Sequence, residues 1–127
     1  MSKVLIIDDD PDLVDAMTNL LEAKGYEVDH APDGEEGLEK AKNDPPNIIL
    51  LDVMMTRKTE GFDVARSLNK EEKTKGIPII LVTGIRHEMN LPFGFEPDED
   101  WLPVKAVLEK PIKPEVLLKT VEDHIKK

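Results

Sequence analysis

Short, continuous apolar runs alternate along this chain with segments in which apolar residues recur every three or four positions. A continuous run bounded by turn residues is typical of a strand buried on both faces, whereas the three-to-four spacing is typical of an amphipathic helix. The strand-like runs are 4–7, 26–31, 48–51, 79–82 and 104–109. This alternation predicts an α/β fold with a parallel sheet.

Helical patterns follow four of these runs. Asp10 is expected to cap the first helix, with Pro11 at its first position and Gly25 as its stop. The other predicted helices are marked by Asp33 to about Lys42, by Phe62 with Ala65 and Leu68, and by Pro114 with Leu117, Leu118, Val121 and Ile125. A helix between the fourth and fifth strands is not predicted with this regularity.

The first, third and fourth runs are apolar throughout, whereas 26–31 and 104–109 alternate with polar residues. Strands that are apolar on both faces belong in the middle of a helix-covered sheet, and alternating strands belong at its edges. Right-handed crossovers then predict the strand order 2-1-3-4-5, a doubly wound, flavodoxin-like fold. Its chain order reverses between the first and third strands, and ligands bind in such folds at the carboxyl ends of the strands beside that reversal.

Composition limits the class of protein. A length of 127 residues predicts a single domain, residues 1–127. The net charge of −10 argues against direct binding to nucleic acid or to an anionic membrane surface, since both are polyanions. The chain has no cysteine and no signal-like apolar stretch, so we expect a cytoplasmic protein.

Polar residues that can handle a phosphoryl group follow the predicted central strands. Asp8 and Asp9 follow the first strand, Asp52 the third and Thr83 the fourth, while Lys110 follows the fifth. Three carboxylates at adjacent strand ends would repel one another unless a cation shares them, and Mg²⁺ is the expected one because it takes oxygen ligands and bridges to phosphate. A carboxylate beside such an ion can attack an activated phosphorus and form an acyl phosphate.

The chain resembles the receiver domain of two-component response regulators over almost its whole length, through VLIIDDDPDLV, IILLDVMM, IILVTG and LEKPIKPEVLL. This resemblance implies that a histidine kinase or a histidine phosphotransfer protein phosphorylates Asp52. It implies Mg²⁺ ligation by Asp9, Asp52 and the main-chain carbonyl of Met54, with Asp8 holding the ion through water. Thr83 resembles the switch hydroxyl of the family and Lys110 its phosphate-contacting lysine. Such a protein is not an enzyme beyond its own phosphorylation and slow dephosphorylation.

The resemblance also sets expectations about partners. Signalling should occur by contact with a downstream protein whose identity the sequence does not reveal, and the chain is compatible with dimerisation. No effector domain follows Lys127, so we expect a stand-alone regulator or a relay intermediate, unless the chain was cut from a longer protein.

Other functions fit less well. An EF-hand loop starting at Asp8 would need glycine and glutamate where Leu13 and Asn19 stand. A phosphatase of the haloacid dehalogenase type would use Asp8 as its nucleophile, but its motif requires threonine or valine at Asp12. A phosphorylation-independent interaction module that keeps the acidic site only as architecture remains the alternative in another class. The three histidines lack metal-ligand spacing.

Three departures from the family pattern are visible. Thr56 replaces the usual proline after the acceptor, and Gly61 comes one residue late. Val107 occupies the position of the aromatic switch, and a valine can pack there but cannot swing. The stretch 84–103 is longer than usual and rich in proline, so we expect the fourth helix to be short or replaced by a loop. This loop carries Phe93, Phe95 and Trp101. It is expected to form a local core, and the functional alternative is a partner surface or a flap over the acceptor site.

Overall fold

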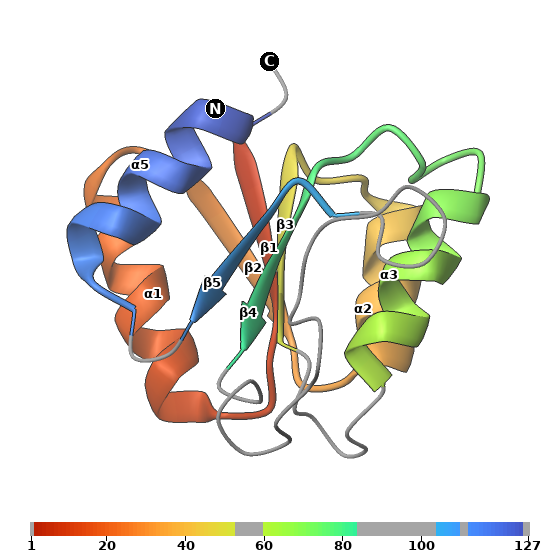
Figure 1. Cartoon of the computed structure of the whole chain (residues 1–127), viewed down its shortest axis with the longest axis horizontal. Coiled ribbons are helices and arrows are strands. Elements are labelled where there is room, and N and C mark those ends of the chain that lie inside the picture. The colour runs from red at the N-terminus through yellow and green to blue at the C-terminus, as the bar shows by residue number, and fades with distance from the viewer. Residues whose placement is uncertain (1, 53–59, 84–103, 110–111, 126–127) are drawn as a thin grey trace, which may run out of the picture.

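The computed structural model describes residues 2–52, 60–83, 104–109 and 112–125, without the side chains of 60–63, 83 and 109. Strands and helices alternate along these ranges, with helices α1, α2, α3 and α5 (Figure 1). Their bounds are β1 Lys3–Ile7, α1 Pro11–Ala23, β2 Glu27–Ala31, α2 Gly34–Asn43, β3 Ile48–Asp52, α3 Glu60–Lys70, β4 Ile79–Thr83, β5 Ala106–Glu109 and α5 Pro114–His124. The prediction about the fourth helix concerns 84–103, which lie outside the described residues.

The five strands form one parallel sheet in the order β2-β1-β3-β4-β5, which confirms the predicted topology. The apolar strands β1, β3 and β4 occupy the centre, and the alternating strands β2 and β5 occupy the edges. All five residues of β3 are buried. The carboxyl ends of all strands therefore meet at one edge of the sheet, to which the arrowheads point in Figure 1.

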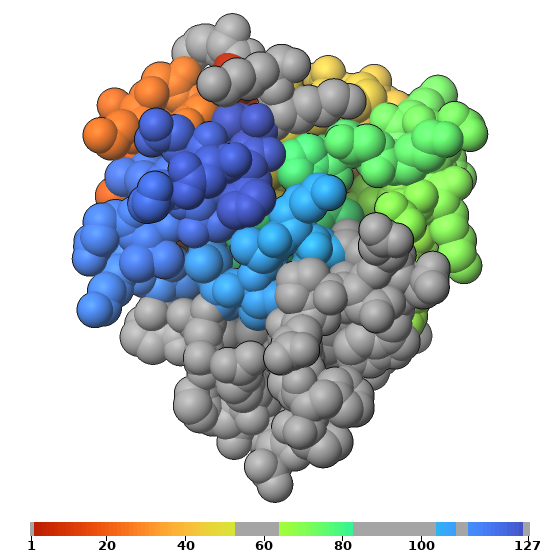
Figure 2. Space-filling model, turned by 45° about the horizontal axis from the view of Figure 1, so that its top comes forward, coloured from red at the N-terminus to blue at the C-terminus, as the bar shows by residue number. Residues whose placement is uncertain are grey.

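Two apolar cores lie on opposite faces of the sheet because successive side chains of a strand alternate between its faces. Val4 and Ile6 pack with buried residues of α1 and α5, whereas Leu5 and Ile7 pack with those of α2 and α3. Figure 1 shows the corresponding layers, with α1 and α5 on one side of the sheet and α2 and α3 on the other. Figure 2 shows α5 and β5 side by side on the surface.

The helix ends follow local rules. Asp10 caps α1 as predicted, with Oδ1 accepting hydrogen bonds from the amides of Asp12 at 3.1 Å and Leu13 at 3.4 Å. Gly25 follows α1 with a φ of +92°, a conformation that favours glycine. Asp33 caps α2 by accepting from the Glu36 amide at 2.8 Å.

Both edge strands begin later than predicted. The Tyr26 amide donates to the Leu21 carbonyl at 3.2 Å and so closes the end of α1, and β2 starts one residue later at Glu27. Strand β5 starts at Ala106, although Val104 is buried in the core on the α2 and α3 face. Ile125 was predicted within the last helix but follows its end as the C-cap residue, half-buried against the other core.

Candidate functional site

Three carboxylates meet at the carboxyl edge of the sheet. Asp8 and Asp9 follow β1, and Asp52 is the last residue of β3. Because Ile7 pairs with Leu51 across these strands, the next residues in each, Asp8 and Asp52, come side by side. One carboxylate oxygen from each of Asp8, Asp9 and Asp52 lies within 4.8 Å of the others. The structure thus brings together the three acids that the sequence placed at the topological reversal.

The turn after β1 holds Asp8 in place. Its amide donates to the Ala31 carbonyl of β2 at 3.0 Å, which continues the sheet ladder by one residue. Its carboxylate Oδ1 accepts a hydrogen bond from the Asp10 amide at 2.9 Å. Only 2% of Asp8 is exposed, as is 2% of Asp52, whereas Asp9 is exposed. Two of the three carboxylates are therefore fixed in a desolvated position and the third faces solvent.

Helix α1 begins two residues after Asp9, so its amino terminus lies next to the cluster. The first turn of a helix carries a partial positive charge, and acids are stabilised near it. The carboxylate of Asp10 accepts hydrogen bonds from amides of that turn that have no partner within the helix. Asp10 therefore has a different role from Asp8 and Asp9. The sequence interpretation of Asp10 as a helix cap is confirmed.

The three carboxylates repel one another when they are charged. Two negative charges within 4.8 Å of each other repel by about 3 kcal/mol or more when the effective dielectric constant is near 20. The amino terminus of a helix stabilises a nearby negative charge by about 0.3–1 kcal/mol, which is less than this repulsion. A divalent cation that prefers oxygen ligands would offset the repulsion. Among the described residues the group holds three carboxylates and no histidine, which suits Mg²⁺ rather than zinc. The donor set therefore fits the expected ion.

The other predicted site residues are described only in part. Thr83 ends β4, and its Cα pairs with that of Glu109 on β5, one step beyond the pairing of Asp52 with Val82. This backbone register puts Thr83 at the same edge of the sheet as the three acids. Met54 and Lys110 lie outside the described residues, as do Thr56, His87 and the segment 84–103.

Val107, at the position of the missing aromatic, is half-buried and packs against the core on the α2 and α3 face. A β-branched side chain has one strongly restricted torsion, so its packing there is fixed. Of the predicted histidines, His30 is exposed on β2, and the ring nitrogen Nδ1 of His124 lies 2.9 Å from the Thr120 carbonyl oxygen on α5. Neither histidine belongs to the acidic cluster.

One polar arrangement near this end of the sheet was not predicted. Lys40 on α2 reaches across to β2, where its Nζ lies 3.2 Å from Oδ1 of Asp29 and 2.6 Å from the His30 carbonyl oxygen. The sequence signal was weak: an acid in an edge strand and a lysine in the helix that follows it. Nothing in the spacing predicts that this lysine also contacts main chain.

The sequence and fold relate the chain to known proteins. The family model for the response regulator receiver domain matches residues 4–122. The chain therefore belongs to the family of response regulator receiver domains. Receiver domains are in general signalling modules rather than enzymes, bind Mg²⁺ at an acidic pocket, and interact with histidine kinases or phosphotransfer proteins.

Individual relatives agree with this assignment. Protein PilH of Pseudomonas aeruginosa is 33% identical over 121 residues, which cover 95% of each chain. The DNA-binding dual master transcriptional regulator RpaA of Synechocystis is 36% identical over 121 residues, which are 95% of this chain and 48% of that protein. The transcriptional regulatory protein CpxR of Escherichia coli is 36% identical over 104 residues, 81% of this chain and 43% of CpxR. The chain thus spans about half or less of these two longer regulators.

Solved structures match the fold. Chemotaxis protein CheY4 of Vibrio cholerae superposes with a TM-score of 0.81 at 30% identity, covering 98% of this chain and 99% of the other. A CheY-like receiver domain protein from Methanospirillum hungatei gives 0.76 at 28% identity, covering 97% and 92%. Among the residues that the structure describes, no helix is long and apolar enough to cross a membrane.

Proposed function

We propose that this receiver accepts a phosphoryl group on Asp52 from the phosphohistidine of a histidine kinase or phosphotransfer protein. The observation that carries the proposal is the meeting of the carboxylates of Asp8, Asp9 and Asp52 within 4.8 Å at the carboxyl ends of β1 and β3. Membership of the receiver family supports the same assignment. Asp52 is chosen as the acceptor because it ends the fully buried strand β3, whose backbone holds it between β1 and β4.

The transfer is a displacement at phosphorus. A carboxylate oxygen of Asp52 forms a bond to the phosphorus atom, and the bond between phosphorus and the histidine nitrogen breaks. The nitrogen keeps the electron pair of that bond and takes up a proton from solvent. The product is an acyl phosphate, which water later cleaves to return the Asp52 carboxylate and inorganic phosphate. The protein therefore carries out one phosphorylation per cycle rather than turnover on a separate substrate.

Asp9, Asp52 and the main-chain carbonyl of Met54 are the proposed ligands of Mg²⁺, with Asp8 holding it through water. When bound, the ion would offset the negative charge that the phosphoryl oxygens bring to an already acidic site. Asp8 is suited to a fixed supporting role because it is 2% exposed and held by the Asp10 amide. Asp9, which is exposed, is suited to direct contact with an ion that keeps several waters.

Thr83 and Lys110 are the proposed contacts of the phosphoryl oxygens, the first by hydrogen bond and the second by charge. The strand register supports this proposal for Thr83, since it ends the strand next to Asp52. For Lys110 the support is the sequence pattern alone. We further propose that the chain works in the cytoplasm and signals by contact with a downstream protein, with dimerisation compatible with that role.

Intact mass spectrometry after incubation with acetyl phosphate and MgCl₂ tests the acceptor. The wild-type chain should gain the mass of a single phosphoryl group, and Asp52→Asn should gain none. Asp15→Asn is the matched control, because it makes the same substitution at an exposed acid of α1 that is not in the cluster. A full adduct on Asp52→Asn would show that the acceptor is another residue.

Phosphoryl uptake and hydrolysis of a phosphate ester together separate the alternative functions. A wild-type chain that takes up no phosphoryl group from acetyl phosphate or from a phosphorylated kinase domain would indicate a phosphorylation-independent interaction module. Repeated hydrolysis of a phosphate ester that is lost in Asp8→Asn would indicate a phosphatase with Asp8 as its nucleophile. The proposed function expects one adduct per chain and no such turnover.

A further inference from the structure

Among the described residues, β2 is an edge strand of the sheet, with β1 as its single neighbouring strand. In a parallel strand, the amide and carbonyl of one residue point to the same side, and those of the next residue point to the other. The Glu27 amide donates to Ser2 and the Ala31 carbonyl accepts from Asp8, so Glu27, Asp29 and Ala31 face β1. Val28 and His30 therefore direct their main-chain groups outward, where another strand could pair with them.

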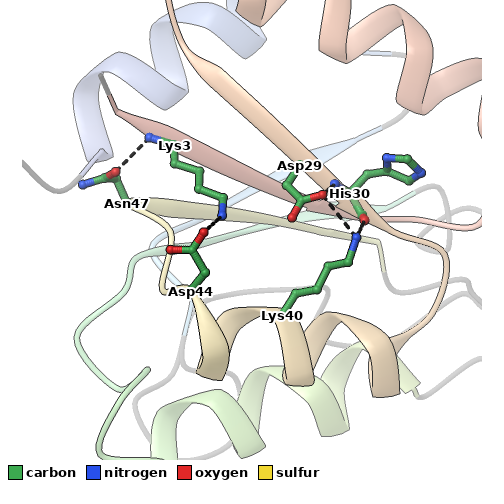
Figure 3. A network of polar contacts seen from close by, with 6 residues as sticks. All are labelled: Lys3, Asp29, His30, Lys40, Asp44 and Asn47. Atoms are coloured by element: carbon green, nitrogen blue, oxygen red, sulfur yellow. Dashed lines mark hydrogen bonds and ion pairs between the residues drawn. The ribbon is translucent and has the colours of Figure 1, made fainter.

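Two side chains form hydrogen bonds with the outward main-chain amide and carbonyl of His30. Oδ1 of Asp29 accepts a hydrogen bond from the His30 amide at 2.8 Å, and Nζ of Lys40 donates to the His30 carbonyl at 2.6 Å. The same ammonium lies 3.2 Å from Oδ1 of Asp29 (Figure 3). The outward amide and carbonyl of His30 are therefore both hydrogen-bonded by this ion pair. The network on the other side of Figure 3, between Lys3, Asp44 and Asn47, does not involve β2.

The residue just before β2 also has its outward amide hydrogen-bonded within the fold. The Tyr26 amide, which alternation also directs outward, donates to the Leu21 carbonyl at the end of α1. Among the described residues of β2, this leaves Val28 as the single residue whose outward amide and carbonyl make no hydrogen bond to another described residue. A strand that adds to a sheet edge needs several consecutive outward residues, so one residue is too short a template.

We propose that Asp29 and Lys40 form an edge clamp that prevents strand addition to β2, and that its loss lets a second copy of this chain pair through β2. Exposed sheet edges are templates for pairing, and proteins block them with charges and side-chain caps. The occupant is a second copy because β2 can pair with itself in an antiparallel manner, with Val28 of one copy opposite His30 of the other.

In that arrangement Asp29 lies opposite Asp29 of the second copy. Like charges directly opposite each other destabilise a strand pair, so Asp29 opposes pairing both by this repulsion and by occupying the His30 amide. Lys40 contributes by occupying the carbonyl and by holding Asp29. This inference does not depend on phosphoryl transfer, since neither residue belongs to the acidic cluster.

Sedimentation velocity over a range of concentrations tests the clamp with the double variant Asp29→Val/Lys40→Met. We expect its self-association to be about tenfold stronger than that of the wild type or more, since hydrogen bonds are gained and a repulsion is removed. The control is Lys42→Met/Glu71→Val, which removes a half-exposed pair 3.8 Å apart between α2 and the residue after α3. It makes the same changes in charge and hydrophobicity away from the edge. Circular dichroism confirms that both variants fold.

Two further measurements locate the contact. Adding Val28→Pro to the clamp variant should reverse the gain, because the β1 ladder does not use the Val28 amide that proline removes. Hydrogen exchange of Val28 and His30 should slow with concentration in the clamp variant without proline, which tests the site if the proline variant does not fold. Unchanged self-association, an equal gain in the control, or a gain without protection of these amides would overturn the proposal.

Discussion

Gly37 of α2 lies directly against Ile7 of β1. A Cβ atom at Gly37 would come within 2.5 Å of Cδ1 and 2.7 Å of Cγ1 of Ile7, which is closer than carbon atoms approach in folded proteins. Ile7 is fully buried and cannot turn away, since close-packed interiors leave little room for a displaced side chain. The absence of a side chain at Gly37 thus allows the helix to sit close to the strand that leads to Asp8 and Asp9.

Gly37→Ala should destabilise the protein despite the better helix propensity of alanine. The propensity gain is about 1 kcal/mol, and overpacking of a core typically costs about 1–3 kcal/mol. We expect a net loss of about 1 kcal/mol in the free energy of unfolding, measured in urea. Ile7→Val removes the atom that would clash most, so the double variant should lose less stability than the sum of the single variants. Additive losses would show that α2 moves away and that Ile7 is not the obstacle.

Asp9→Ala should weaken Mg²⁺ binding and leave the ion-free protein as stable as the wild type or more stable. The reason is that a carboxylate oxygen of Asp9 lies within 4.8 Å of one from each of two other acids, so that removing Asp9 removes a repulsion. Thermal unfolding with and without MgCl₂ measures both effects, because a bound ligand raises the apparent stability. Asp15→Ala, an exposed acid of α1 outside the cluster, should keep the full Mg²⁺ response. An Asp9→Ala protein with an undiminished Mg²⁺ response would exclude Asp9 as a ligand.

Asp10 should contribute to stability through its cap and not through its charge. Replacing an N-cap aspartate with alanine typically costs about 1 kcal/mol, so Asp10→Ala should lower the free energy of unfolding by about that amount. Asp10→Ser keeps an acceptor for the amides of α1 and removes a negative charge next to the cluster. We therefore expect Asp10→Ser to be at least as stable as the wild type in ion-free buffer. Equal losses in both variants would argue against the capping role.

The pair Asp29 and Lys40 should make stability depend on pH in the acid range. Burial by itself would raise the pKa of Asp29, but the hydrogen bond from the His30 amide and the Lys40 ammonium hold that pKa below its ordinary value of 3.8. A group whose pKa is lower in the folded state stabilises the fold above its unfolded pKa, and this contribution disappears as the pH falls through the folded pKa.

A double-mutant cycle with Asp29→Asn and Lys40→Met should therefore give a coupling energy of about 0.2–1 kcal/mol near pH 6, as is usual for partly exposed pairs. The coupling should fade once the pH falls below about 4, the ordinary pKa of aspartate. Lys75 and Glu72, whose side chains are 56% and 87% exposed, form a control pair for which we expect a smaller coupling at every pH. A coupling that persists under acid conditions would show that the ionised Asp29 carboxylate is not its source.

Much of this fold was readable from local patterns. Burial on both faces requires an unbroken apolar run, so the central positions of β1, β3 and β4 followed from their composition. The handedness of crossovers then left one natural strand order, and that order placed Asp8, Asp9 and Asp52 at one edge. The roles of all six predicted site residues stay predictions, as does the structure of 84–103; these residues are Asp8, Asp9, Asp52, Met54, Thr83 and Lys110.

Other features were decided only when α2 docked on the sheet. The depth of that docking places Gly37 against Ile7 and brings Lys40 to the His30 carbonyl, and neither distance is encoded by a periodicity.

The first residues of β2 and β5 also differed from expectation, because a residue such as Tyr26 joins a strand or a turn according to where its amide finds a partner. The sequence by itself determined the elements, their order and the acidic cluster, because side-chain periodicity and handedness are local properties. Tertiary structure decided how the exposed backbone edge of β2 is closed, because that depends on which side chain the packed helix delivers to it.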